Sequence, residues 1–193
     1  MSKIKVNSWL QACDSARQTI RSVASTLLDQ QCYELFFICD SLKDLWEEAE
    51  EKDCCTVVCG LCAANYRLAG TAKIIANAAM QALTAVDGLS VYGLGIKQTL
   101  MDHQSAINDF VMVLQNDCRN DLMHLTSELA VILEHQFVLG DDSLRSRLQS
   151  LHDTLEDRVE SLYEMGDQLE KHSIMGIDTT NIGILKVIHS AGA

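Results

Sequence analysis

The sequence predicts an all-α fold, an elongated antiparallel bundle of four to six long helices, and two features lead to this prediction. The chain has 193 residues and no proline, although average usage would give about ten. Because proline breaks helix interiors, its absence suits a chain that is helical almost throughout. Between Cys54 and Ile96, moreover, the only charged residues are Arg67, Lys73 and Asp87. We expect one domain over residues 1–193, with an apolar segment in its middle.

Residues 4–52 carry the first helical stripe. Its apolar residues recur at intervals of seven, but the repeat slips by one residue between Leu27 and Leu28. A straight helix of 3.6 residues per turn produces such a slip. No Gly or Pro interrupts the segment, so it is predicted either as one helix or as two with a break near Asp29–Gln31. The stripe consists of Val6, Cys13, Ile20 and Leu27, followed by Leu28, Leu35, Leu42 and Ala49.

The acidic stretch Glu47–Asp53 predicts a solvated turn, and Asp53 can cap the helix that follows. Gly88 is expected to end that helix, since glycine tolerates the left-handed conformation that closes helices. We expect residues 54–86 to form a central buried helix. Its predicted core face comprises Cys55, Cys59, Cys62, Ala69, Ala72, Ile75, Ala76, Ala79, Met80 and Leu83.

Three further helices are expected in the second half of the chain. One runs from about Leu94 to Leu139 and is stopped by Gly140, and Asp141–Ser143 caps the next, which ends near His172. A short last helix is predicted from Asp178 to Ile188. Their stripes are Leu100, His103, Ile107, Phe110, Val111, Leu114, Cys118, Leu122, Leu125, Leu129, Ile132, Leu133 and Phe137, then Leu144, Leu148, Leu151, Leu155, Val159, Leu162 and Leu169.

The eight cysteines are predicted to be reduced thiols that fill gaps in the core, because the N-terminus shows no secretory signal. This interpretation implies a cytoplasmic or cytosol-facing protein. Cys55, Cys59 and Cys62 have the spacing with which radical enzymes hold an iron–sulfur cluster on three thiolates. Such enzymes also need a barrel of strands, so core packing is the preferred prediction. Cluster binding, lipidation and redox sensing are its alternatives.

No metal, cofactor or small-molecule substrate is predicted. Asp121, His124, Glu128 and His135 fall near one side of a helix, but di-iron bundles need Glu-x-x-His on two helices. A solvated flank is therefore expected there. His103, within an apolar stripe, is expected to be a buried histidine, with a pH switch as the alternative. His152 and His172 are expected at the surface.

Neither catalysis nor nucleic-acid binding is expected from this sequence. No nucleophile–base pair stands out, which favours a protein that is not an enzyme. Asp and Glu number 27 against 15 Lys and Arg, a net charge of −12. Affinity for nucleic acid depends mainly on cationic side chains that neutralise phosphates, so an acidic chain without a basic stretch is poorly suited to it.

The connection Gly88–Ile96 is apolar, whereas turns between helices usually face water and are polar. One interpretation is that it folds back onto the bundle. The alternative is a contact surface, and we predict on this basis a non-enzymatic interaction protein that binds a protein partner or self-associates there. The predicted contact residues are Leu89, Val91, Tyr92, Leu94 and Ile96.

The alternative function is membrane activity, in which the same tip inserts into a bilayer. In outline the chain resembles the α-helical pore-forming toxins, which carry an apolar head on long helices. The resemblance is architectural and covers residues 54–139. Asp87 and the glycines that follow it interrupt the apolar stretch Ile74–Ile96, so a tip that inserts shallowly or after rearrangement is favoured over a permanent span. The reduced cysteines and the lack of a visible signal argue against the resemblance.

Overall fold

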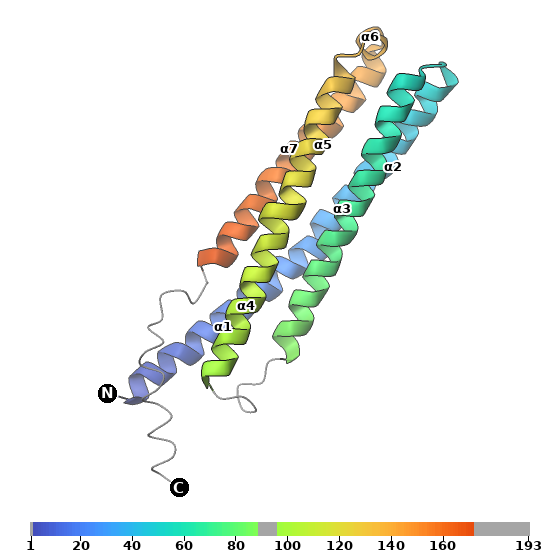
Figure 1. Ribbon diagram of the computed structural model, residues 1–193. Helices are drawn as coiled ribbons and strands as arrows, with labels where there is room; N and C mark the ends of the chain where they lie inside the picture. Colours follow the sequence, from blue (N-terminus) through green and yellow to red (C-terminus); the bar gives the residue numbers. More distant parts are fainter. Residues whose placement is uncertain (1, 89–95, 172–193) are drawn as a thin grey trace.

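The computed structural model describes residues 2–88 and 96–171; the side chains of residues 2–10, 12, 13, 88, 96–101, 103 and 104 lie outside this description. All regular elements within those ranges are helices, which confirms the all-α prediction. Figure 1 shows an elongated bundle of long helices that pack side by side. The predicted helix Asp178–Ile188 lies outside the described residues.

The described residues form four long rods. The first is continuous through α1 (Ser2–Thr26), the π-helical η1 (Leu27–Gln31) and α2 (Cys32–Glu51), and the second is α3 (Cys55–Gly88). The third runs through α4 (Ile96–Met112), the π-helical η2 (Val113–Cys118) and α5 (Arg119–Leu133). After the short α6 (Gln136–Leu139), α7 (Asp142–Lys171) is the fourth rod.

The π turn η1 decides whether residues 4–52 form one helix or two. Thr26 and Cys32, on either side of it, have helical dihedral angles, so the segment is one helix without a break. A π turn inserts one extra residue into an α-helix. The slip between Leu27 and Leu28 is therefore the signature of this insertion, and its interpretation as the drift of a straight helix was wrong.

A second π turn, η2, was not predicted although the sequence carries the same signal. The buried positions Ile107 and Leu114 are seven apart, Leu114 and Leu122 are eight apart, and Leu122 and Leu129 are again seven apart. Met112 and Arg119 are helical on either side. The extra residue thus lets the third rod keep one face on the core from Ile107 to Leu133.

At one end of the bundle, only one of the two predicted helix caps is found. Asp141 caps α7 as predicted, because its Oδ1 accepts from the Leu144 N–H at 3.0 Å. Asp53 does not cap α3; it adopts the left-handed conformation, with φ 56°, and its N–H donates to Glu50 at 3.0 Å. An ion pair between Lys52 and Asp141, at 2.6 Å, joins the α2–α3 turn to the start of α7.

The core is a continuous apolar cluster to which all four rods contribute. From Ile107 onward, the predicted stripes of the third and fourth rods are confirmed, except that Ile132, Phe137 and Val159 are only half-buried and that α5 ends at Leu133. The side chains of Leu100 and His103 lie outside the described residues. α3 is not the central buried helix that we expected. It has one buried face and one exposed face, like its neighbours, and Tyr66 in its middle is 83% exposed.

A group of polar side chains joins the first rod to α7 at η1. Gln31 is buried; its Nε2 donates to Ser161 Oγ at 3.0 Å, and its Oε1 accepts from Arg158 Nη1 at 3.3 Å. Arg158 also pairs with Glu34 at 2.5 Å. Because buried polar groups need partners, these bonds fix the first rod relative to α7.

Candidate functional site

The predicted contact residues of the tip lie almost entirely outside the described part of the chain. Leu89, Val91, Tyr92 and Leu94 lie outside the described residues, and Ile96 begins α4 without a described side chain. The end of α3 that leads to the tip is tied to α1, because Arg21 Nη2 and Asp87 Oδ1 are 2.5 Å apart. The tip hypothesis therefore stays a prediction.

The cysteines at the start of α3 are not core residues, which corrects the sequence prediction. Cys55, Cys59 and Cys62 share one face of the helix as expected, but that face is exposed, while Cys54 is half-buried. The core face is formed instead by residues two positions away, as at Val57 and Leu61. The same face continues inward through Ala64, Leu68, Thr71, Ala72, Ile75, Ala79, Ala82 and Val86.

Three other cysteines are buried, as predicted. Burial raises the pKa of the Cys32 thiol, and burial together with the charge of Asp40 raises the pKa of Cys39 to about 11. Burial, with smaller contributions from Asp117, Asp121 and Cys32, raises the pKa of Cys118 to about 12. Since the thiolate is the reactive form of cysteine, we expect low reactivity of these three thiols in the folded protein. The side chain of Cys13 lies outside the described residues.

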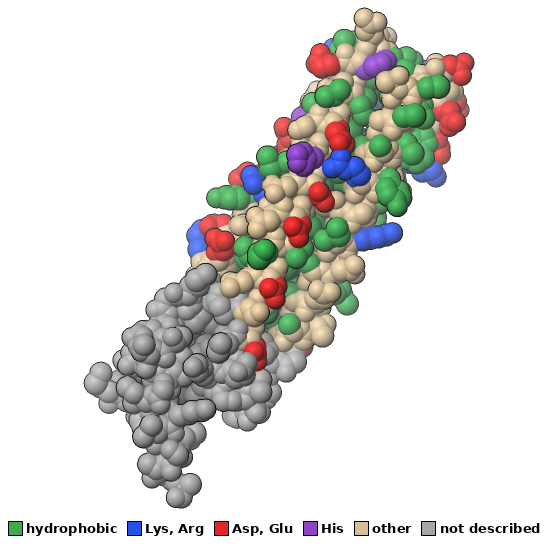
Figure 2. All heavy atoms as spheres, viewed as in Figure 1, with side chains coloured by type: hydrophobic (Ala, Val, Ile, Leu, Met, Phe, Trp, Pro, Cys, Tyr) green, Lys and Arg blue, Asp and Glu red, His purple; other side chains and the backbone are tan. Residues whose placement is uncertain are grey.

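Four aromatic side chains on α2 and α3 are exposed, and we call them the aromatic surface: Tyr33, Phe36, Phe37 and Tyr66. Their exposed fractions are 72%, 43%, 63% and 83%. Cys32 contacts the Ala72 carbonyl and Cys39 the Asn65 carbonyl, so this part of α2 runs antiparallel to residues 65–72 of α3. Phe36 and Phe37 thus lie at the same level of the bundle as Tyr66. Over α3, the face drawn in Figure 2 shows many hydrophobic side chains.

The helix flank with Asp121, His124, Glu128 and His135 does not converge on a metal site. Glu128 pairs with Arg67 of α3, and His124 is exposed. His135 lies beyond the end of α5, where its Nδ1 accepts from the Phe137 N–H at 3.3 Å and caps α6. Of the predicted solvated flank, His124 and Glu128 are exposed, whereas Asp121 and His135 are half-buried.

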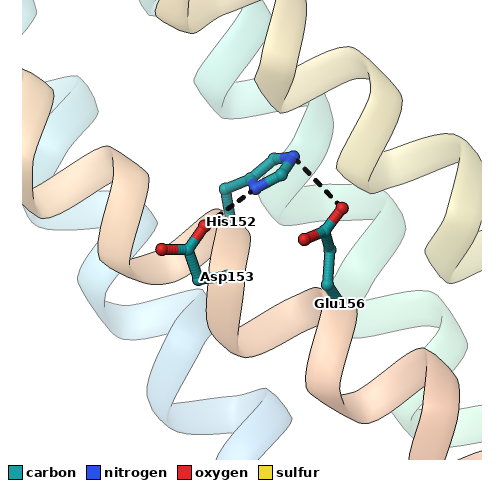
Figure 3. A group of neighbouring side chains, drawn as sticks. All are labelled: His152, Asp153 and Glu156. Carbon is teal, nitrogen blue, oxygen red and sulfur yellow. Dashed lines mark hydrogen bonds and ion pairs between the residues drawn. The ribbon is translucent and has the colours of Figure 1, made fainter.

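A different group, His152, Asp153 and Glu156, brings metal-type ligands together on α7 (Figure 3). Contrary to prediction, His152 is largely buried, with 14% of its side chain exposed. Its Nδ1 lies 3.3 Å from Asp153 and its Nε2 4.0 Å from Glu156. The three residues offer one ligand atom each, and these atoms lie within 4.8 Å of one another; this is one ligand fewer than a structural zinc site uses.

Asp153 has a second role in this group. A hydrogen bond from Gln149 Nε2, 2.7 Å long, and then the contact with His152 lower the pKa of the Asp153 carboxyl. The carboxylate is thus already satisfied by its own helix. We assign the group to the structure of α7. The side chain of His103 and the whole of His172 lie outside the described residues.

An open groove of about 140 Å³ between α3 and the third rod is a further candidate. Its walls are largely alanine, with Phe110 and Val113, and Asp109 is the one ionisable residue among them. Such a lining can bury an apolar side chain but supplies no nucleophile with a base.

Comparison with known proteins finds no relative: no family model, no curated protein and no solved structure matches this chain. Among the described residues, no helix combines the length and the apolar character needed to cross a bilayer.

Proposed function

We propose that this chain is a non-enzymatic helical-bundle protein, facing the cytosol, that binds a protein partner or a second copy of itself through apolar surface. The observation that carries the proposal is the aromatic surface on α2 and α3. The predicted tip, Gly88–Ile96, follows directly from the end of α3, so both candidate contact surfaces involve the same helix.

The composition of the aromatic surface is that of an interface core. Interface cores are enriched in Tyr, Phe and Met and depleted of Asp, Glu and Lys. The chain has only two Trp, four Tyr and four Phe, and its buried cluster is built mainly from Leu, Ile, Val and Ala. Aromatic side chains bury about 150–250 Å² each, so leaving Tyr33, Phe37 and Tyr66 exposed forgoes a large part of the available hydrophobic stabilisation.

The charge distribution favours the α3 side of this surface, where Tyr66 lies. The chain carries a net charge of −12, yet no Asp or Glu occurs between Cys54 and Val86. Two acidic molecules repel each other, and interfaces avoid juxtaposing like charges. α3 is therefore the rod along which a second copy, or another acidic protein, meets least repulsion.

Site-specific photo-crosslinking tests this proposal. A benzophenone amino acid replaces Phe37 or Tyr66 in the full chain, and replaces Val131 of α5 in the control, because Val131 is 74% exposed. We expect irradiation to give one discrete adduct at positions 37 and 66, and none at 131. Mass spectrometry then identifies the adduct as a second copy or another protein. Equal yields at all three positions, or no adduct, would refute the proposal.

The tip and its membrane-active alternative need a separate test, because they lie outside the described residues. Replacing Val91 and Leu94 by Asp places two charges in the apolar connection. If the tip is the contact, the double variant loses self-association or partner binding. If the tip inserts into a bilayer, the unmodified protein floats with neutral liposomes and the variant does not. Unchanged behaviour in all three assays removes the tip from the proposal.

A further inference from the structure

The start of α3 concentrates the accessible thiols of the described chain. Cys55, Cys59 and Cys62 are exposed and Cys54 is half-buried, and all four are free thiols. Cys32, Cys39 and Cys118 are buried. The described thiols thus form two groups. One is buried in the core, and the other is accessible at Cys54 and in the first two turns of α3.

Two of the accessible cysteines stand in a Cys-x-x-Cys sequence whose intervening residues are fixed. Leu61 is fully buried, and Gly60 lies so close to α5 that a Cβ there would be 2.9 Å from Ile132. The turn of α3 between Cys59 and Cys62 is therefore held against the core while both thiols face outward. This anchoring keeps the two sulfur atoms on neighbouring turns of one rigid surface.

Helix geometry brings this pair within reach of a disulfide. Residues three apart in an α-helix have Cα atoms about 5 Å apart, inside the range of roughly 4.4–6.8 Å that disulfides span. Cys55 and Cys59, four residues apart, are about 6 Å apart by the same geometry. Both pairs thus lie within that range, and Cys59 and Cys62 are the pair whose intervening residues, Gly60 and Leu61, are held against the core.

We propose that Cys59 and Cys62 form a redox-active dithiol, which a small disulfide such as oxidised glutathione converts to an intramolecular disulfide. The thiolate of one cysteine attacks the small disulfide, forms a mixed disulfide and expels one thiolate. The second cysteine then attacks the protein sulfur of the mixed disulfide and expels the other. The protein loses two protons and two electrons, and the small disulfide is reduced to two thiols.

The disulfide is expected to be easily reduced. Cβ atoms three residues apart in a helix are about 5–6 Å apart, whereas a relaxed disulfide needs roughly 3.5–4.5 Å. Closing the bond must tighten one turn of α3, and strained or exposed disulfides are the labile ones. The buried thiols do not compete, because burial disfavours their thiolates.

One tryptic peptide reports the whole reaction. Trypsin cuts after Lys52 and Arg67, and the peptide between these cuts contains Cys54, Cys55, Cys59 and Cys62. The reduced full-length protein is treated with oxidised glutathione, alkylated and digested. We expect the peptide to lose two alkylation sites, placed at Cys59 and Cys62 by fragmentation, and excess reduced glutathione to restore both.

Two serine variants separate this dithiol from general thiol reactivity. Cys62→Ser should stop at a mixed disulfide of glutathione with Cys59, while the control Cys55→Ser should react like the unmodified protein. Both positions are exposed, so unchanged circular dichroism is expected and checks the fold. Four alkylated sites after treatment, a disulfide that uses Cys54 or Cys55, or a mixed disulfide persisting in the unmodified protein would each overturn the proposal.

Discussion

Deleting one residue tests whether the π turn η1 is an insertion that the bundle can lose. Gln30 is exposed within η1. Without it, the π turn can become ordinary α-helix, and the residues before and after keep their orientation toward the core. No buried side chain is lost, so we expect the free energy of unfolding to change by less than about 1 kcal/mol, as for most surface changes.

Deleting Asp40, also exposed, is the matched comparison. It rotates the rest of α2 by about 100° and takes Leu42 and Leu45, both at most 1% exposed, out of the core. At about 1.5–3 kcal/mol for each leucine, the loss is about 3–6 kcal/mol. If η1 became ordinary α-helix in this variant, Leu42 and Leu45 could stay in the core. Leu35 and Ile38 would then rotate away from it, at a similar cost in free energy of unfolding.

Urea unfolding followed by far-ultraviolet circular dichroism measures both deletions. A loss of about 3–6 kcal/mol is a large fraction of the roughly 5–15 kcal/mol that stabilises most domains, so the Asp40 deletion should unfold at much lower urea or not fold at all. The Gln30 deletion should unfold near the midpoint of the unmodified protein. Equal destabilisation by the two deletions would refute the assignment of η1.

Three further predictions concern single contacts. Asp53→Gly should raise the free energy of unfolding by about 1 kcal/mol, because residue 53 is left-handed, a conformation that glycine adopts without strain; a lower urea midpoint would contradict this. Gly166→Ala should cost about 1–3 kcal/mol, since its Cβ would overlap the Gln115 side chain, and Gln115→Ala should relieve the cost; an unrelieved loss would contradict it. The hydrogen bond from Lys52 lowers the pKa of Asp141, so this carboxylate stabilises the fold above its unfolded-state pKa and loses that effect as the pH falls through its folded-state pKa. In Lys52→Met, the free energy of unfolding should therefore fall less steeply as the pH is lowered. An unchanged pH dependence would exclude the contact.

The leucine stripes were enough to predict the fold class and most of the core. Along the third and fourth rods, leucines recur on one face with polar residues between them, so only one face can be buried. The same stripe also indicated η2, because Leu114 and Leu122 are eight residues apart instead of seven. A single irregular interval of this kind is easily attributed to the drift of a straight helix of 3.6 residues per turn. The Leu35–Cys39 run carried a signal that the sequence analysis did not use, because five consecutive apolar residues on a helix cannot all face one core.

The orientation of α3 could not be predicted in the same way. This helix is apolar on two sides, and cysteine, alanine and glycine suit a core and an exposed surface almost equally. Cys55, Cys59 and Cys62 follow the same spacing as Val57, Leu61 and Ala64, and only packing against the other rods decides between them. The candidate site was missed for this reason, since both the dithiol and Tyr66 lie on the face that sequence alone assigned to the core.

The exposure of that face is the central claim, and the alkylation rates of individual thiols test it most directly. The native, reduced protein is exposed to iodoacetamide for increasing times, then digested and measured by mass spectrometry. We expect Cys55, Cys59 and Cys62 to react at rates close to those of the unfolded chain, and Cys32, Cys39 and Cys118 to react only on unfolding. Protection of Cys59 and Cys62 to the same degree as Cys118 in the dilute protein would contradict the account.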